Sequence, residues 1–147
     1  MKILFATDGS AHSKAVVRKF AKRTFTPDTK VRIISAYDGS FYAMNAAPIG
    51  VMSEYYMDAA KYLKKAAENA NEYVEKILRK KNPSLSISLA AVEGSAKDVI
   101  LEESEKFGAD LIVVGSHGHG AVERFLLGSV SQSVVLHAKC SVEIVRK

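Results

Sequence analysis

Glycine and hydroxyl residues recur at a fixed spacing in the last third of the chain: Gly115-Ser116-His117-Gly118, nine further residues, then Gly128-Ser129. Glycines directly after a buried strand let the backbone take positive φ and bring its N–H groups close to a ligand, which we expect of Gly115 and Gly118. Gly128-Ser129 stands where a helix is predicted to begin. A helix start offers unpaired N–H donors and the positive end of the helix dipole. The spacing therefore indicates a phosphate-binding loop, in which the Ser129 hydroxyl could add a hydrogen bond.

An ordinary glycine-rich loop with Ser129 as a helix N-cap explains the same residues, and the residues alone leave both interpretations open. The Walker motif is excluded, because it needs Lys directly after its second glycine and the chain has no Gly-Lys pair. The dinucleotide fingerprint belongs after the first strand of a unit, where this chain has Thr7-Asp8-Gly9-Ser10 instead.

Asp8 follows the first apolar run and is the second residue that could do chemistry. A carboxylate there would repel phosphates but accept hydrogen bonds from ribose hydroxyls or a base. The alternative is that Asp8 or Ser10 only caps the following helix.

These residues must be positioned by strands that alternate with helices. The predicted strands are 2–7, 31–37, 85–92, 111–114 and 142–145, and the predicted helices are 10–23, a long helix ended by Asn82-Pro83-Ser84, one from Ser95 to Gly108, and 129–137. Residues 38–54 fit neither period and are predicted to be a loop. The alternation predicts an α/β fold with one doubly wound, mostly parallel five-stranded sheet and helices on both faces. Ligands bind such sheets outside the carboxyl ends of the strands, so the loops after Thr7 and Val114 are the expected site.

The composition fits one soluble domain, residues 1–147, with 48% hydrophobic and 25% charged residues. The net charge of +5 is modest and interleaved, without the basic block expected of a nucleic-acid-binding protein. The one cysteine, Cys140, suits a reducing compartment. Because neither a secretory signal nor an apolar stretch of about 20 residues is present, we expect a cytoplasmic protein with no membrane contact.

Three stretches carry a family resemblance: Ala6-Thr7-Asp8-Gly9-Ser10, Val92-Glu93-Gly94, and Val113 to Gly118 continuing through Arg124 to Gly128-Ser129-Val130-Ser131. Together they resemble the universal stress protein family over essentially the whole chain. Gly-x2-Gly-x9-Gly-Ser is the signature of that family's ATP-binding branch. The resemblance implies a Rossmann-like, adenine nucleotide α-hydrolase-like fold and a regulatory or stress-response module that binds ATP, with Mg²⁺.

The resemblance also implies a role for each matching residue. Asp8 would contact ribose and base beside Ala6 and Thr7, and the backbone of Ala36 would read the adenine edge. The remaining implied nucleotide-binding residues lie along the nucleoside or around the phosphates: Val114, Gly115, Ser116, His117, Gly118, Arg124, Gly128, Ser129, Val130 and Ser131.

Many family members dimerise, and the last strand would lie at an exposed sheet edge. We therefore expect a homodimer through Val142, Ile144 and Val145, with Glu143 facing its own mate or meeting Arg146 or Lys147 of the partner. Ser141 stands where proline often precedes that strand in the family, and Ala6 stands where some ATP-binding relatives have proline.

Other function classes stay open. A slow ATPase or phosphotransferase would need a general base beside the γ-phosphate, which the sequence does not supply. A receiver domain would need an acid after the third strand, where Val92-Glu93-Gly94 is a poor match. A nucleotide-free interaction protein would not need the glycine motif. His117 and His119 lack the further ligands of a metal site, so no protein metal ligand is predicted.

Overall fold

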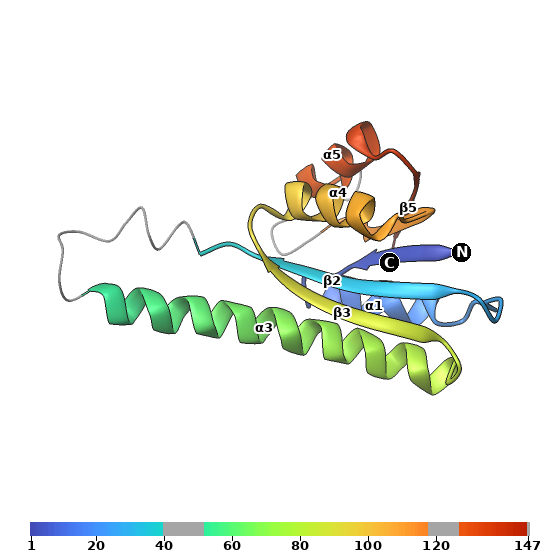
Figure 1. Ribbon diagram of the computed structural model, residues 1–147, viewed down its shortest axis with the longest axis horizontal. Helices are drawn as coiled ribbons and strands as arrows, with labels where there is room; N and C mark the ends of the chain where they lie inside the picture. The colour runs from blue at the N-terminus through green and yellow to red at the C-terminus, as the bar shows by residue number, and fades with distance from the viewer. Residues whose placement is uncertain (40–51, 118–126, 147) are drawn as a thin grey trace.

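The computed structural model describes residues 1–39, 52–117 and 127–146, which form five strands and four helices (Figure 1). The strands are β1 (Lys2–Ala6), β2 (Lys30–Tyr37), β3 (Ser86–Glu93), β4 (Leu111–Gly115) and β5 (Ser141–Val145). The helices are α1 (Ala11–Phe20), α3 (Met52–Lys81), α4 (Ala96–Phe107) and α5 (Ser129–His137).

All five strands are parallel and lie in the order β3-β2-β1-β4-β5. The chain builds the sheet outward from β1 to β3, then returns to the other side of β1 with β4 and β5. The expected α/β fold with a doubly wound parallel sheet is therefore confirmed. The order reverses between β1 and β4, and this is where open sheets of this kind bind ligands.

Helices α1 and α3 cover one face of the sheet and α4 and α5 cover the other (Figure 1). Alternate residues of β1 supply both cores, because successive side chains of a strand point to opposite faces. Phe5 packs against Phe20 of α1 with ring centroids 5.1 Å apart, whereas Leu4 packs with the α4 and α5 residues Ile100 and Val134. Burial on both faces explains why the strands read as apolar runs.

The caps explain most helix boundaries. The Ser10 hydroxyl accepts a hydrogen bond from the Ser13 N–H at 3.1 Å and so caps α1, which ends at Phe20, three residues before the prediction. Ser95 occupies the N-cap of α4, but its side chain makes no capping bond. Gly108 ends α4 in the left-handed conformation, with φ of 65°.

Helix α3 begins at Met52, so the predicted loop over 38–54 is too long at its carboxyl end, and residues 40–51 lie outside the described residues. Ala67, Ala70 and Val74, which repeat along α3 at steps of three and four and so share one face of the helix, are buried. Asn71 is also buried, at 1% exposure. Its amide donates to Ala90 O at 2.8 Å and its Oδ1 accepts from the Ser35 hydroxyl at 2.9 Å, which ties α3 to β2 and β3.

The outer side of α1 differs from the other helices in charge. Every charged side chain between Ala11 and Arg23 is basic and exposed: Lys14, Arg18, Lys19, Lys22 and Arg23. Helices α3 and α4 instead carry ion pairs along their own length, such as Arg79 with Glu75 and Lys106 with Glu102. Within the described residues, Arg23 alone of the α1 group has a carboxylate partner, Glu143 of β5.

Candidate functional site

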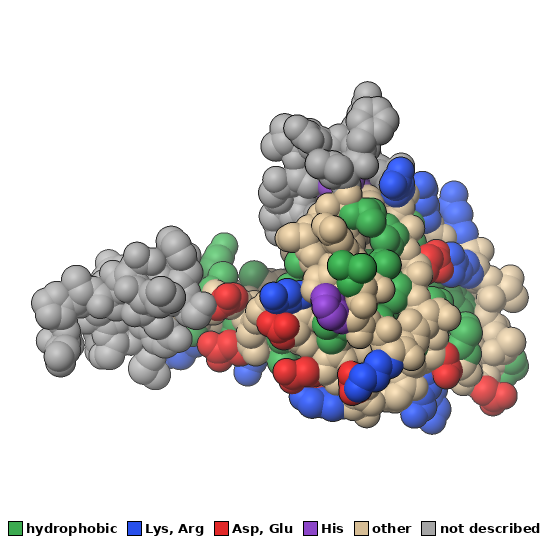
Figure 2. All heavy atoms as spheres, turned by 90° about the horizontal axis from the view of Figure 1, so that it is seen from above, with side chains coloured by type: hydrophobic (Ala, Val, Ile, Leu, Met, Phe, Trp, Pro, Cys, Tyr) green, Lys and Arg blue, Asp and Glu red, His purple; other side chains and the backbone are tan. Residues whose placement is uncertain are grey.

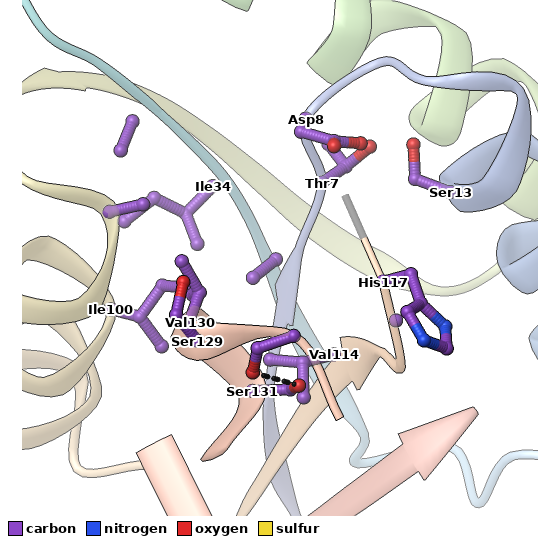
Figure 3. Close-up of a pocket in the computed structure, with 15 residues that line it drawn as sticks. Thr7, Asp8, Ser13, Ile34, Ile100, Val114, His117, Ser129, Val130 and Ser131 are labelled. Atoms are coloured by element: carbon purple, nitrogen blue, oxygen red, sulfur yellow. Dashed lines mark hydrogen bonds between the residues drawn. The ribbon is translucent and has the colours of Figure 1, made fainter. Parts of the chain in front are cut away.

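A pocket of about 490 Å³ opens at the carboxyl ends of β1 and β4, the point where the strand order reverses (Figure 3). Its volume lies within the range of small-molecule sites. The two loops expected to form a site thus lie side by side. The lining residues are Ala6, Thr7, Asp8, Ser13, Ile34, Ala36, Ala96, Ile100, Val114, Gly115, His117, Gly128, Ser129, Val130 and Ser131.

The pocket has an apolar part and a polar part. Ile34 of β2, Ile100 of α4 and Val130 of α5 gather on one side of it (Figure 3). Thr7, Asp8 and Ser13, from the end of β1 and the first turn of α1, lie on another side. A flat apolar ring and a hydroxyl-rich or charged group could therefore be bound at once.

The turn after β1 holds Asp8 at the rim of the pocket. Asp8 is exposed, and its Oδ1 accepts a hydrogen bond from the Ser10 N–H at 3.0 Å. Gly9 makes the turn with φ of 73°, and a β-carbon there would lie 3.1 Å from Cβ of Ala70 on α3. Ser10, not Asp8, therefore caps α1, while Asp8 braces the turn and faces the pocket.

The glycine at the start of α5 brings two backbone segments together. Gly128 N–H donates to Ser116 O at 2.8 Å, and a β-carbon on Gly128 would lie 3.3 Å from that same oxygen. Its φ of −63° is accessible to any residue, and Gly115 is not among the glycines with positive φ. The expectation of positive φ at Gly115 is therefore wrong: space, not backbone conformation, favours glycine at these two positions.

The N-terminus of α5 lies at the pocket end lined by Ser129, and its first N–H groups have no partner within the helix. The first helical bond joins Gln132 N–H to Gly128 O at 2.9 Å, so the N–H groups of residues 129–131 precede the hydrogen-bonded ladder. Gly128 has no capping side chain. The Ser131 hydroxyl donates to Gly128 O at 2.8 Å, drawn as a dashed line in Figure 3. This helix start can therefore hold an anion.

Ser116 is the one described residue of the predicted set that does not line the pocket. It is 1% exposed, and its hydroxyl lies 3.0 Å from His117 Nδ1 and 3.4 Å from His12 Nε2. Eleven of the fourteen predicted nucleotide-binding residues line the pocket. Besides Ser116, the two predicted residues that are not among these eleven are Gly118 and Arg124, and both lie outside the described residues.

Sequence reasoning missed four lining residues: Ser13, Ile34, Ala96 and Ile100. Ile34 could have been found, since it lies two residues before Ala36 on the same face of β2. The α4 residues could not, because their place depends on how α4 crosses the sheet.

Two further chemistries lack support in the described part of the chain. No group of three His, Cys, Asp or Glu residues there could hold a metal ion. Burial, followed by the charge of Asp110, raises the pKa of the Cys140 thiol, which disfavours the thiolate that a nucleophile needs.

No helix in the described ranges is long and apolar enough for a membrane crossing.

The sequence model of the Universal stress protein family matches residues 1–146 of this chain. The chain belongs to the universal stress protein family. A protein of Staphylococcus aureus strain USA300, named as a universal stress protein, is 31% identical to this chain. The alignment has 150 positions and covers 98% of this chain and 82% of that relative.

Solved universal stress proteins share the fold. One, in complex with cAMP, is 25% identical, covers 99% of this chain and 96% of its own, and has a TM-score of 0.64. A family member from Arabidopsis thaliana with AMP bound is 19% identical, covers 100% and 92% of the two chains, and has a TM-score of 0.70.

Proposed function

We propose that this universal stress protein binds an adenine nucleotide, with ATP as the leading ligand, in the pocket between β1 and β4. The observation that carries the proposal is the pocket's composition: an apolar side, an exposed carboxylate and an uncapped helix start line one space of about 490 Å³. The two related structures described above hold AMP and cAMP, which supports an adenine ligand here.

The nucleoside fits the apolar and carboxylate parts. Ile34, Ile100 and Val130 offer aliphatic surface to a purine ring. The exposed Asp8 carboxylate only accepts hydrogen bonds, which suits the hydroxyls of a ribose. Placing a phosphate beside Asp8 would cost electrostatic energy, so the ligand has one favoured direction in the pocket.

The phosphates fit the start of α5. The N–H groups of residues 129–131 and the positive end of the helix dipole favour negative charge there. Mg²⁺ keeps several of its waters and is held in nucleotide sites mainly by phosphate oxygens. With no group of three protein ligands in the described residues, the metal would arrive with ATP, and the Ser129 hydroxyl could add an oxygen ligand. The charge of the Mg²⁺ ion would neutralise part of the charge of the phosphates.

We infer that the protein acts as a cytoplasmic, one-domain regulatory module of the stress response, in which nucleotide occupancy rather than turnover is the output. Among the described residues that line the pocket, Asp8 is the one carboxylate, and it lies at the proposed nucleoside end rather than beside the γ-phosphate. Slow ATP hydrolysis or phosphotransfer is the alternative, and hydrolysis measured with bound Mg-ATP distinguishes the two.

Isothermal titration of nucleotide-free protein with ATP, AMP and adenosine, each with and without Mg²⁺, tests the site. We expect ATP to bind and Asp8→Ala to lower the affinity for adenosine as well as for ATP. No detectable ATP binding at millimolar nucleotide would sink the proposal. An Asp8→Ala effect limited to ATP would instead assign Asp8 to the metal. Native mass spectrometry of the purified protein would reveal a nucleotide retained from the cell.

The place of β5 at the edge of the sheet supports a homodimer. β5 is the last strand of the sheet and pairs only with β4 in the described chain. An open strand edge invites pairing with a second copy. The face that carries α4 and α5 also shows a cluster of hydrophobic side chains (Figure 2), and Val135 and Leu136 of α5 are 46% and 69% exposed. Pairing through β5 would bring this apolar surface close to its copy.

A further inference from the structure

A buried hydroxyl joins two histidines beside the pocket. Ser116 Oγ lies 3.0 Å from His117 Nδ1 and 3.4 Å from His12 Nε2. The two imidazole rings meet edge to face, at a centroid distance of 5.5 Å and an angle of 73°. His117 follows β4 and lines the pocket, whereas His12 lies in the first turn of α1 and does not. The three side chains therefore form a hydrogen-bonded chain from the pocket to α1.

The one hydroxyl hydrogen can be donated to only one of the two ring nitrogens, so the neutral groups have two arrangements in which Ser116 donates to one ring and accepts from the other. In the first, His12 Nε2–H donates to Ser116, Ser116 donates to His117 Nδ1, and His117 carries its proton on Nε2. In the second, His117 Nδ1–H donates to Ser116 and Ser116 donates to His12 Nε2. His117 Nε2 is then a bare lone pair, which can only accept.

His117 Nε2 is buried and has no hydrogen-bond partner among the described residues. A buried polar atom without a partner is costly, so a ligand atom that completes its hydrogen bond would be favoured. A phosphate oxygen accepts hydrogen bonds and does not donate them. It can therefore pair with His117 Nε2 in the first arrangement and would be repelled by the lone pair of the second.

We propose that a phosphate oxygen of the bound nucleotide selects the first arrangement, and that Ser116 thereby passes the presence of phosphate to the imidazole of His12. His12 is a positioning residue in this chain: by donating its Nε2–H to Ser116 Oγ, it leaves the hydroxyl hydrogen of Ser116 available to His117 Nδ1. By thermodynamic linkage, the hydrogen placement on His12 and the affinity for phosphate are coupled in both directions. The inference rests on the proposed nucleotide site, and adds to it a residue on α1 that responds to the ligand without lining the pocket.

Long-range ¹H–¹⁵N spectra of the histidine side chains read the position of each ring hydrogen directly. The four histidines are assigned with His12→Gln, His117→Gln and His137→Gln. On saturation with ATP, we expect Nε2 of both His12 and His117 to take the shift of a protonated nitrogen. Adenosine, which has no phosphate, should leave the His12 ring unchanged. His137, whose Nδ1 lies 2.8 Å from Ser133 O on α5, is the internal control and should not respond.

Ser116→Ala breaks the chain but leaves both imidazoles, so it is the deciding variant. In it, ATP should still move the His117 resonances and no longer those of His12. The inference is overturned if His12 does not respond to ATP in the native chain, responds equally to adenosine, or responds unchanged in Ser116→Ala. Titration calorimetry on the same samples separates this inference from the proposed nucleotide site. If the protein does not bind ATP, the heat of binding is absent. If only the Ser116–histidine hydrogen bonds do not respond to phosphate, the heat of binding remains.

Discussion

The two hydroxyls at the start of α5 have different surroundings although they stand two residues apart. Ser129 is exposed and lines the pocket. Ser131 is 3% exposed, and its hydroxyl lies within hydrogen-bond distance of Gly128 O at 2.8 Å and of Ser116 O at 3.3 Å. The first is placed for a ligand and the second holds the helix start against the loop after β4.

Replacing each serine by alanine separates these roles. Ser129→Ala should weaken ATP binding by roughly 1.5–3 kcal/mol, the value of a hydrogen bond to a charged group, with the urea midpoint unchanged. Ser131→Ala should lower the free energy of unfolding by about 1 kcal/mol, because carbonyls of Gly128 and Ser116 lose a donor. Calorimetry and urea unfolding on both variants measure this. Equal effects on affinity and stability from the two changes would contradict the assignment.

Two glycines of the site should respond differently to a single methyl group. Gly9→Ala forces a side chain into φ of 73° and 3.1 Å from Ala70 Cβ, so we expect a loss of about 1–2 kcal/mol or more in unfolding free energy. Gly128→Ala keeps an ordinary φ and moves Ser116 O by a few tenths of an ångström. It should cost less stability but lower ATP affinity, and Gly128→Val should abolish binding. If Gly128→Val bound ATP normally, the phosphate site would lie elsewhere.

The role of a site residue could be predicted from the sequence where it depends on neighbouring residues, and not where it depends on how distant segments fold together. Asp8 and Ser129 stand out in the sequence because each follows or begins an element that the apolar pattern marks. The buried place of Ser116 could not be read, since it depends on His12 from α1, 104 positions earlier. Ile100 reaches the pocket only because α4 crosses the sheet above β1 and β2.

Among the elements, α3 is longer than the strands on which it packs. Its 30 residues span about 45 Å, whereas the eight residues of β3 span about 26 Å. The amino-terminal part of α3 projects beyond the sheet (Figure 1). No residue between Asp58 and Ala66 is buried, but Ala67, Ala70, Val74 and Leu78 are.

Amide hydrogen exchange should therefore divide α3 in two. We expect residues 58–66 to exchange much faster than residues 67–78, because packing on the sheet supplies most of a helix's stability. Exchange measured by mass spectrometry on overlapping peptides resolves the two halves. Equal protection along the whole helix would mean that another surface, such as a second copy, covers the projecting part.

The existence and order of the elements followed from the sequence more closely than their ends. Periodic apolar residues predict a strand or a helix, but its last residue depends on local bonds. Lys22 N–H bonds to Lys19 O and Arg23 N–H to Phe20 O, so the predicted last turn of the first helix becomes a tighter turn. Residues 38–54 fit neither period, and Met52 to Glu54 nonetheless belong to α3.

At the scale of the whole molecule, Glu143 has a partner that the sequence did not indicate. It pairs with Arg23 in the turn after α1, with one nitrogen–oxygen distance of 2.7 Å, rather than with a residue of a second chain. Val142 and Ile144 lie on the opposite face, against the core beneath α4 and α5. Glu143 is thus already neutralised within its own chain, which removes an obstacle to antiparallel pairing of two β5 strands.

Sedimentation equilibrium at tens of micromolar should show a dimer. Ile144→Lys should give monomers, since it puts a charge on the edge strand, while Glu143→Gln should leave the mass unchanged. Far-UV circular dichroism and ATP titration of Ile144→Lys check that its own core is intact. A monomeric native chain, or a dimer unaffected by Ile144→Lys in a folded variant, would refute this interface.

The basic residues of α1 and of the turn after it make the charge distribution of the molecule uneven. The chain has 21 Lys and Arg and 16 Asp and Glu, so the five basic residues from Lys14 to Arg23 equal the entire excess, and the remainder balances. The protein should therefore behave as a dipole that adsorbs to a negatively charged matrix through α1. On a cation exchanger, Lys14→Glu with Lys22→Glu should elute at lower salt than Lys64→Glu with Lys97→Glu, although both pairs lower the net charge equally. Identical elution would mean that total charge alone governs adsorption, whereas different elution would show that the matrix meets the protein in one preferred orientation.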